Sequence, residues 1–303
     1  MIDAQRLGAF ERELEPWRLQ ADGDRVLVLG YGEISLVFAL AEQPDVAYKR
    51  MPLFGSVEEA RGYEAAYRRY CELLRQAGLE LPEDETLVVE VPGRPVVLYI
   101  AQRRLPAQRF CHRLIHQLDE ARCQALLERI VERIAGVWAF NARSSPSVEL
   151  AIDGQISNWV LTADGSMLFV DTSTPIFRES GAERLDPELF LASAPALLRP
   201  LLRLLFLEEV MSRYYDRRRV YTDLAANLFK EGRPELLPHA IRIANSRLPP
   251  DVPPLDEEEV RKYYRGDKRI WGVFLAFRRM DRWMKTRIHG GRYEFVLPGR
   301  IRR

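Results

Sequence analysis

Two oxygen-bearing side chains stand at the ends of a short strand-turn-strand pattern. Asn158 precedes the apolar run 159–161, and Asp171 follows the apolar run 167–170. The Asp-Gly pair at 164–165 is typical of a two-residue type I′ loop, which predicts that the numbers of facing residues sum to 329. Asn158 would then face Asp171 at the open end of the hairpin. Amide and carboxylate oxygens are ligands that Mg²⁺ accepts, so the pair predicts a metal site.

A further carboxylate, Asp153, lies five residues before Asn158 in the irregular segment that enters the hairpin. A carboxylate in this position could orient or deprotonate the hydroxyl group of an acceptor molecule. Asp153 is therefore the candidate catalytic residue.

A second group of candidate residues surrounds a glycine-rich turn near the N-terminus. Gly30, Gly32, Ser35 and Val37 form the pattern G-x-G-x-x-S-x-V, and Lys49 ends the run VAYK. Glycines let the backbone approach phosphate groups, and a lysine supplies a compact positive charge for phosphate oxygens. The pattern predicts a phosphate-binding turn followed by a phosphate-binding lysine.

A helix is expected soon after this lysine, because residues 56–77 carry apolar side chains at helical spacing. Ser56 and Glu59 form a capping-box pattern at its start. On this helix Glu64 is the best candidate to pair with Lys49 and fix its position, and Glu58 and Glu72 are weaker alternatives.

The elements that must position these residues follow from the hydrophobic patterns. Apolar runs in the first hundred residues predict an antiparallel sheet with one inserted helix, and the later patterns are mainly helical around the hairpin. The sequence therefore predicts an α+β fold. The strands are expected within 25–49, 86–91 and 95–101, and the main helices over 56–77, 119–141 and 189–215.

The order of these features makes residues 30–171 resemble the protein-kinase-like superfamily, which combines a Gly-rich loop, a strand lysine, a catalytic Asp, an Asn and a metal-binding Asp. The resemblance implies a two-lobed fold. Residues 1–102 would form the N-lobe with its antiparallel sheet and one helix. Residues 103–255 would form a mainly helical C-lobe with the catalytic-loop hairpin and metal site. Residues 256–303, a basic aromatic segment, would pack on the C-lobe.

The same resemblance assigns ATP and Mg²⁺ as cofactors. Asp153 would be the catalytic base, and Asn158 and Asp171 would be the magnesium ligands. The segment that begins with Gln102 and Arg103 would be the hinge whose backbone receives adenine. The complete set of implied nucleotide-binding residues is Gly30, Gly32, Ser35, Val37, Ala47, Lys49, Glu64, Gln102 and Arg103.

Several positions depart from the pattern of regulated protein kinases. Ala151 stands where a His or Tyr usually precedes the catalytic Asp by two residues, Gly154 replaces a leucine, and Thr172 follows the metal-binding Asp in place of Phe-Gly. These departures favour the branch that includes aminoglycoside and choline phosphotransferases. The first hypothesis is therefore an ATP- and Mg-dependent phosphotransferase acting on the hydroxyl of a small molecule. The alternative is a nucleotide-binding pseudokinase that serves as a scaffold or regulator.

Charge is distributed unevenly along the chain. The net charge is +1, yet residues 261–303 contain 14 Lys or Arg and three Asp or Glu, a local balance of +11. Such a segment can bind an anionic ligand or surface, or can close over an acidic lobe. A polyanion-binding protein is thus a third hypothesis.

The remaining features bear on location and on a second metal site. Cys71, Cys111 and Cys123 form no CxxC pair, which argues against a disulfide framework. No signal peptide is expected, and the most apolar stretch, 197–210, carries four charges and predicts a buried amphipathic helix, with no transmembrane segment. A cytoplasmic protein fits best. His112 and His116 have zinc-like spacing, but Arg113 stands where a zincin carries Glu.

Overall fold

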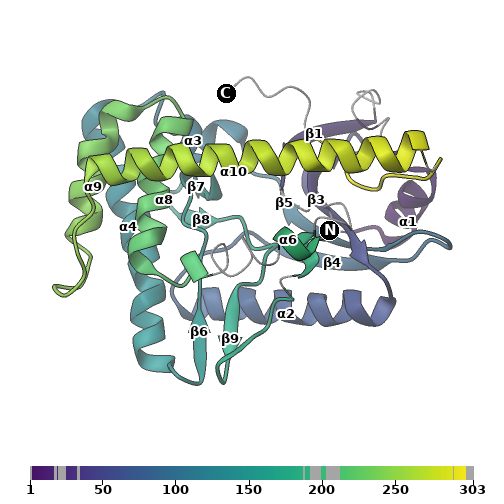
Figure 1. The fold of residues 1–303 in the computed structure, drawn as a ribbon, viewed down its shortest axis with the longest axis horizontal. Coiled ribbons are helices and arrows are strands. Elements are labelled where there is room, and N and C mark those ends of the chain that lie inside the picture. The colour runs from purple at the N-terminus through teal and green to yellow at the C-terminus, as the bar shows by residue number, and fades with distance from the viewer. Residues whose placement is uncertain are drawn as a thin grey trace.

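The computed structural model describes residues 2–16, 19, 25–32, 35–186, 188–191, 199–202, 212–288 and 290–297, with the side chains of 190, 201, 202 and 271 excepted. The chain is an α+β protein: an antiparallel sheet with flanking helices forms one part, and a mainly helical part follows (Figure 1). This coarse prediction is confirmed. Within the described residues, no helix combines the length and the hydropathy needed to cross a bilayer.

The sheet has five strands in the order β1-β2-β3-β5-β4, and every neighbouring pair is antiparallel. The chain enters it as a meander, because short turns join the first three strands. The strand bounds are β1 Val26–Tyr31, β2 Leu36–Leu40, β3 Gln43–Phe54, β4 Asp84–Val89 and β5 Val96–Arg103.

One helix covers each face of this sheet. Helix α2 (Val57–Gln76) begins where the Ser56 side chain accepts a hydrogen bond from the Glu59 amide, and Gly78 with a φ of +89° follows its end. It packs on the face that carries Met51, Leu98 and Ile100. Helix α1 (Ala4–Glu13), which the sequence analysis did not predict, packs on the opposite face against a core that contains Tyr48 and Tyr99.

The helical part is built around the hairpin of β7 (Trp159–Leu161) and β8 (Met167–Phe169). Helices α4, α8 and α9 and this hairpin share one hydrophobic core. A second small sheet has the order β10-β9-β6. The remaining bounds are α3 Cys111–Leu114, α4 Glu120–Ser144, β6 Val148–Leu150, β9 Phe177–Glu179, β10 Ala182–Glu183, α5 Glu188–Leu191, α6 Arg199–Leu202, α8 Arg217–Lys230, α9 Leu237–Asn245 and α10 Glu257–Trp283. The helix expected over 197–210 lies mostly outside the described residues.

The C-terminal segment joins the two parts of the molecule. Helix α10 spans the long axis in Figure 1 and contacts α8 and α9. A π-helical turn, η6 (Met284–Ile288), follows. Residues 290–297 then reach the face of the sheet that α1 covers, where Glu294 pairs with Arg50. This segment, which was expected to pack on the helical part, therefore also supplies a carboxylate to the buried Arg50 guanidinium of the sheet.

Candidate functional site

The hairpin register differs from the predicted one. Trp159 faces Phe169 and Leu161 faces Met167, so facing residues sum to 328. The Thr162 amide bonds the Ser166 carbonyl at 3.0 Å, and Gly165 has a φ of +89°. The loop thus has three residues, 163–165, and its last residue is a glycine in the left-handed conformation. Loops of this kind are common in hairpins, after the two-residue type. Asn158 consequently lies opposite Val170, whose amide donates to the Asn158 carbonyl at 2.9 Å, and Asp171 follows one residue later.

Asp171 is joined to Lys49 from the sheet. Lys49 Nζ lies 3.0 Å from Asp171 Oδ1 and 3.3 Å from both the Val170 carbonyl oxygen and Ser173 Oγ. Burial alone would raise the pKa of Asp171, but the Lys49 charge and the hydrogen bonds from Lys49 and Ser173 outweigh it and hold this pKa below its usual value. Asp171 is therefore an ionised carboxylate at neutral pH.

Asp171 also retains capacity for a further ligand. Both Lys49 and Ser173 engage Oδ1. No described residue donates to Oδ2, and 35% of the Asp171 side chain is exposed, against 11% for Lys49. The second carboxylate oxygen is thus accessible from solvent.

The Asn158 side chain is oriented by the backbone of the segment that precedes the hairpin. Asn158 Nδ2 donates to the Asp153 carbonyl oxygen at 3.1 Å. The amide nitrogen is thereby occupied, which leaves Oδ1 as the group able to bind a cation. With Asp171 Oδ2, the chain offers two oxygen donors of the type that Mg²⁺ takes from proteins. In the described part of the chain, no group of three or more His, Cys, Asp or Glu side chains is arranged around a metal position.

Asp153 lies in a strongly acidic surrounding. Its Oδ1 accepts a hydrogen bond from the Gln155 amide at 3.1 Å. Burial, then the negative charges of Asp223 and Asp171, raise the pKa of Asp153 well above its usual value. A carboxylate with a raised pKa binds a proton more tightly, as a general base must.

Gly154 explains one departure from the kinase pattern. A Cβ atom at this position would lie 2.7 Å from Val220 Cγ1 and 2.8 Å from Ile134 Cδ1. Helices α4 and α8 therefore leave no room for the leucine that the kinase pattern has here. The glycine lets the segment with Asp153 lie directly on these two helices.

The predicted ion pair between Glu64 and Lys49 is not formed. Glu64 Oε2 lies 2.6 Å from Arg61, and Oε1 accepts from Arg68 and from Thr86 of β4. Helix α2 directs tyrosines, not Glu64, at the segments around Asp171 and Asp153: Tyr63 donates to the Ser173 carbonyl oxygen at 2.7 Å, and Tyr70 to the Ala151 carbonyl oxygen at 2.9 Å. Glu64 directly follows Tyr63 on the helix, so its side chain points in another direction, toward Thr86 on the edge strand β4. The alternative Glu72 pairs with Arg69 instead.

The glycine-rich turn lies beside Lys49. Gly30 faces Val37, Val37 faces Lys49, and all three therefore share one face of the sheet. Gly30 leaves that face without a side chain. The Gly32 amide donates to the Ser35 carbonyl at 2.9 Å, and a Cβ on Gly32 would lie 2.5 Å from Ser35 Oγ, so any other residue here would force the serine side chain to rotate.

The remaining predicted nucleotide contacts divide between the two faces of the sheet. Ala47 faces Gln102 across β3 and β5, on the face that carries Lys49. The Gln102 side chain is buried and its Nε2 donates to Thr172 Oγ1 at 3.1 Å. Arg103 is exposed and points away from this face.

Four residues of the site were not predicted as part of it. Ser173 and Thr172 bind Lys49 and Gln102, Tyr63 anchors the segment after Asp171, and Asp223 of α8 repels the Asp153 carboxylate. Asp223 Oδ2 is buried without a hydrogen-bond partner. The run Thr172-Ser173 directly after Asp171 was the available signal for two of them. Asp223 carries no sequence signal.

The two histidines with zinc-like spacing lie in and just after a short helix. Helix α3 ends at Leu114, and His116 lies in the turn that follows, where its amide bonds the Arg113 carbonyl at 3.2 Å. His112 Nδ1 is buried without a hydrogen-bond partner. Burial, followed by the charges of Arg113 and Lys230, lowers the pKa of His112 to about 4.

This shift predicts a loss of stability on acidification. Unfolded His112 binds a proton near pH 6.5, whereas the folded protein resists it until about pH 4, so stability falls as the pH falls between these values. The full contribution is about 3 kcal/mol. Urea denaturation across this range should show a shallower pH dependence for His112→Asn. The matched variant His116→Asn, at an exposed position, should keep the wild-type slope.

Comparison with known proteins identifies a family. No curated protein matches the chain. A family model described as a family of unknown function (DUF6206) matches residues 11–282, which include the sheet, both flanking helices in whole or in part, the hairpin and nearly all of α10. The chain therefore belongs to the DUF6206 family.

Proposed function

We propose that the chain is an ATP- and Mg²⁺-dependent phosphotransferase of the protein-kinase-like type, which moves the γ-phosphate to a hydroxyl of a small molecule. The contact that carries this proposal is the ion pair between Lys49 and Asp171, 122 positions apart in the chain. A strand lysine and a post-hairpin carboxylate are the two charged groups that such enzymes direct at the nucleotide phosphates and metal.

The architecture supports a two-lobed arrangement. The five-stranded antiparallel sheet with α2 inserted between β3 and β4 would be the N-lobe, residues 1–102. The helices around the β7–β8 hairpin would be the C-lobe, residues 103–255. The hydrogen bond between Gln102 of β5 and Thr172 links the two parts close to where the nucleotide would bind.

Each polar group has a role in this proposal. Lys49 would hold phosphate oxygens, and Asn158 Oδ1 with Asp171 Oδ2 would hold magnesium. The bound metal would neutralise charge on the phosphates. Asp153 would accept the proton of the acceptor hydroxyl, and the raised pKa that burial and its acidic neighbours give it suits that task. Asp223 would sustain this pKa through repulsion.

Replacing Asp153 separates catalysis from binding. Asp153→Asn should lower the rate of phosphoryl transfer by about 10²–10⁴-fold, because a general base is lost. The affinity for ATP with Mg²⁺ should remain, because Asp153 lies outside the predicted phosphate and metal ligands. Transfer from labelled ATP to a panel of hydroxylated metabolites measures the first quantity, and calorimetric titration the second. Nucleotide binding by the wild-type chain without modification of any acceptor would contradict the proposal.

A pseudokinase scaffold is the second candidate, and two observations favour it. Glu64 is engaged away from Lys49, and Ala151 stands in place of the usual His or Tyr, with its carbonyl accepting from Tyr70 at 2.9 Å. For a scaffold, Asp153→Asn should leave both nucleotide affinity and biological activity unchanged. Loss of biological activity with unchanged nucleotide affinity would exclude it.

We further propose a cytoplasmic location. Cys71, Cys111 and Cys123 are all buried free thiols. Burial raises the pKa of Cys111 to about 12 and that of Cys71 to about 11, which keeps both in the unreactive thiol form. Unpaired structural thiols of this kind suit a reducing compartment.

A further inference from the structure

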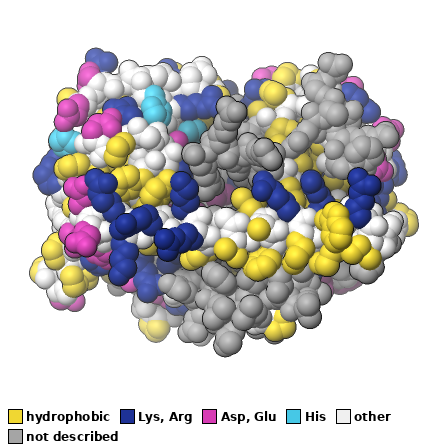
Figure 2. All heavy atoms as spheres, turned by 45° about the horizontal axis from the view of Figure 1, so that its top comes forward, with side chains coloured by type: hydrophobic (Ala, Val, Ile, Leu, Met, Phe, Trp, Pro, Cys, Tyr) yellow, Lys and Arg dark blue, Asp and Glu magenta, His cyan; other side chains and the backbone are white. Residues whose placement is uncertain are grey.

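An apolar stripe runs along the outer face of α10 and η6. Its members are exposed large hydrophobic side chains, and they recur at helical spacing on one continuous segment. Figure 2 shows hydrophobic side chains gathered along this helix on the molecular surface. The apolar stripe consists of Ile270, Val273, Met280, Trp283 and Ile288, with exposed fractions of 40%, 47%, 41%, 57% and 59%. A contiguous exposed set of this kind marks an interaction surface.

Basic side chains border the stripe. Residues 261–288 contain ten Lys or Arg and two Asp, a local net charge of +8. Figure 2 shows Lys and Arg clustered on one half of the helix and along one edge of the hydrophobic band. Arg265, Lys268, Arg269, Arg279, Arg282 and Arg287 are all exposed. The surface is thus an apolar band with positive charge at one end and along one edge.

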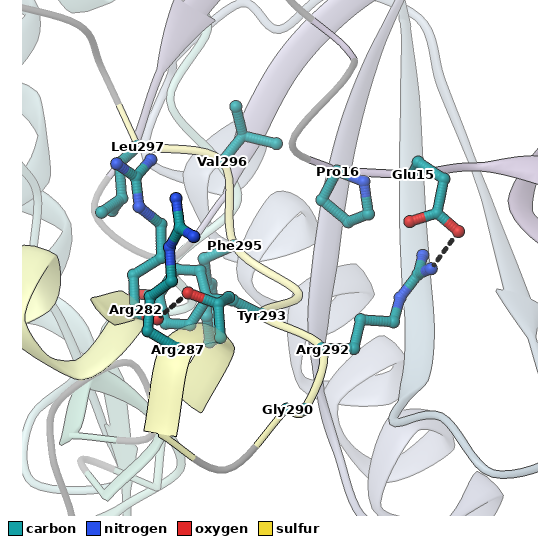
Figure 3. A pocket seen from close by; sticks show the side chains of 12 residues that line it. Glu15, Pro16, Arg282, Arg287, Gly290, Arg292, Tyr293, Phe295, Val296 and Leu297 are labelled. Atoms are coloured by element: carbon teal, nitrogen blue, oxygen red, sulfur yellow. Dashed lines mark hydrogen bonds and ion pairs between the residues drawn. The ribbon is translucent and has the colours of Figure 1, made fainter. Parts of the chain in front are cut away.

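A pocket opens at the C-terminal end of this surface. It has a volume of about 710 Å³ and lies between η6 and the segments around Glu15 and Tyr293. The Arg282 and Arg287 side chains lie next to each other in it (Figure 3). Arg292, also in the lining, is neutralised by Glu15 and Glu294. Among the described residues, no carboxylate pairs with Arg282 or Arg287. Two adjacent guanidinium groups without an acidic partner suit a phosphate group.

We propose that the apolar stripe and the arginine pocket dock the protein on a membrane surface that contains anionic lipids. Trp283 and Ile288 would enter the boundary between head groups and acyl chains, and Arg282 and Arg287 would bind a lipid phosphate. An amphipathic helix with apolar and aromatic residues on one side and Lys or Arg beside them binds membranes in this way. This inference is independent of the phosphotransferase activity.

Charge distinguishes this occupant from a second copy of the chain. Two copies joined through the apolar stripe would bring together two segments of local charge +8, and like charges at an interface are unfavourable. Anionic head groups instead supply the complementary charge, and each basic residue near such a surface adds to the binding. Trp283 favours the interface further, because indole rings prefer the head-group level of a bilayer.

Vesicle flotation of the full chain tests the proposal. The protein should float with phosphatidylcholine vesicles that contain ~30% phosphatidylglycerol, should bind pure phosphatidylcholine far less, and should be released by ~0.5 M salt. Trp283→Ser should lower the partition coefficient about tenfold. Arg282→Gln and Arg287→Gln should each lower it about fivefold.

Arg143→Gln serves as the matched control. Arg143 is exposed in the last turn of α4, and Figure 1 shows that this end of the helix, next to β6, lies away from α10. Its loss should leave the partition unchanged. Melting temperatures confirm that each variant is folded. An equal fall for Arg143→Gln, equal binding to uncharged vesicles, or no binding of the wild-type chain would overturn the proposal. So would concentration-dependent dimerisation that Trp283→Ser abolishes, because the stripe would then join two copies.

Discussion

Replacing Asp171 by alanine should abolish the magnesium-dependent stabilisation of the chain by ATP. Asp171 is the point at which the sheet and the hairpin meet, because its Oδ1 binds Lys49 and Ser173. Its Oδ2 accepts from no described residue and is the proposed metal ligand. Removal of this carboxylate takes away one of two metal ligands and releases the lysine. We expect phosphoryl transfer to fall by at least about 10³-fold.

The thermal shift on addition of ATP and Mg²⁺ measures this effect directly. Shifts, not absolute melting temperatures, should be compared, because Asp171→Ala also removes the partner of the largely buried Lys49. Asp164→Asn is the matched control: it lies on the same hairpin but is exposed at the turn. It should retain the magnesium-dependent shift. A full shift in Asp171→Ala would show that the nucleotide and metal bind elsewhere.

Replacing Arg50 by methionine should cost about 3–5 kcal/mol in the free energy of unfolding. Arg50 is 2% exposed and binds Glu11 of α1, which is fully buried, and Glu294 of the C-terminal segment. Tyr99 donates a further hydrogen bond to Glu11. The variant would leave the buried Glu11 carboxylate without its two Arg50 hydrogen bonds and with Arg94 at 4.0 Å, which is the costly situation for a buried ion pair.

The double variant Arg50→Met with Glu11→Leu separates the cost of an unpaired buried charge from the net contribution of the ion pair to the free energy of unfolding. Removing both charges should restore much of the lost stability, because the Glu11 carboxylate is removed together with Arg50 and Glu294 keeps its ion pair with Arg292. Arg122→Met, in an exposed ion pair with Asp119, should change stability by no more than about 1 kcal/mol. Urea denaturation measures all three. A cost for Arg50→Met no larger than that for Arg122→Met would show that α1 and the C-terminus are held by other contacts.

Local patterns in the sequence were sufficient for the coarse architecture. Alternating apolar runs predicted the antiparallel sheet, and Ser56 with helical spacing predicted the start of α2. These signals work because strand pairing and helix capping depend on residues close in sequence. The predicted hairpin was also found, but one residue out of register, since Asp164-Gly165 suits either a two-residue loop or the end of a three-residue loop.

The expected partner of Lys49 shows that local sequence patterns do not predict which distant side chains form an ion pair. Spacing alone made Glu64 the best candidate on α2, ahead of Glu58 and Glu72. The rotation of that helix is decided by burial of Tyr63, Tyr67 and Tyr70, whose rings fill the space between the helix and the rest of the molecule. Glu64 is thereby turned to Thr86, and Lys49 reaches Asp171 instead.

The sequence by itself determined the residue types that a phosphotransferase site requires, the α+β class and the concentration of positive charge near the C-terminus. Only the tertiary structure decided which charges meet. It joined Lys49 to Asp171, brought Asp223 near Asp153, and buried Arg50 between carboxylates from opposite ends of the chain. The reason is physical: a capping or turn signal acts over a few residues, whereas an ion pair forms wherever packing of the core brings two distant side chains within contact.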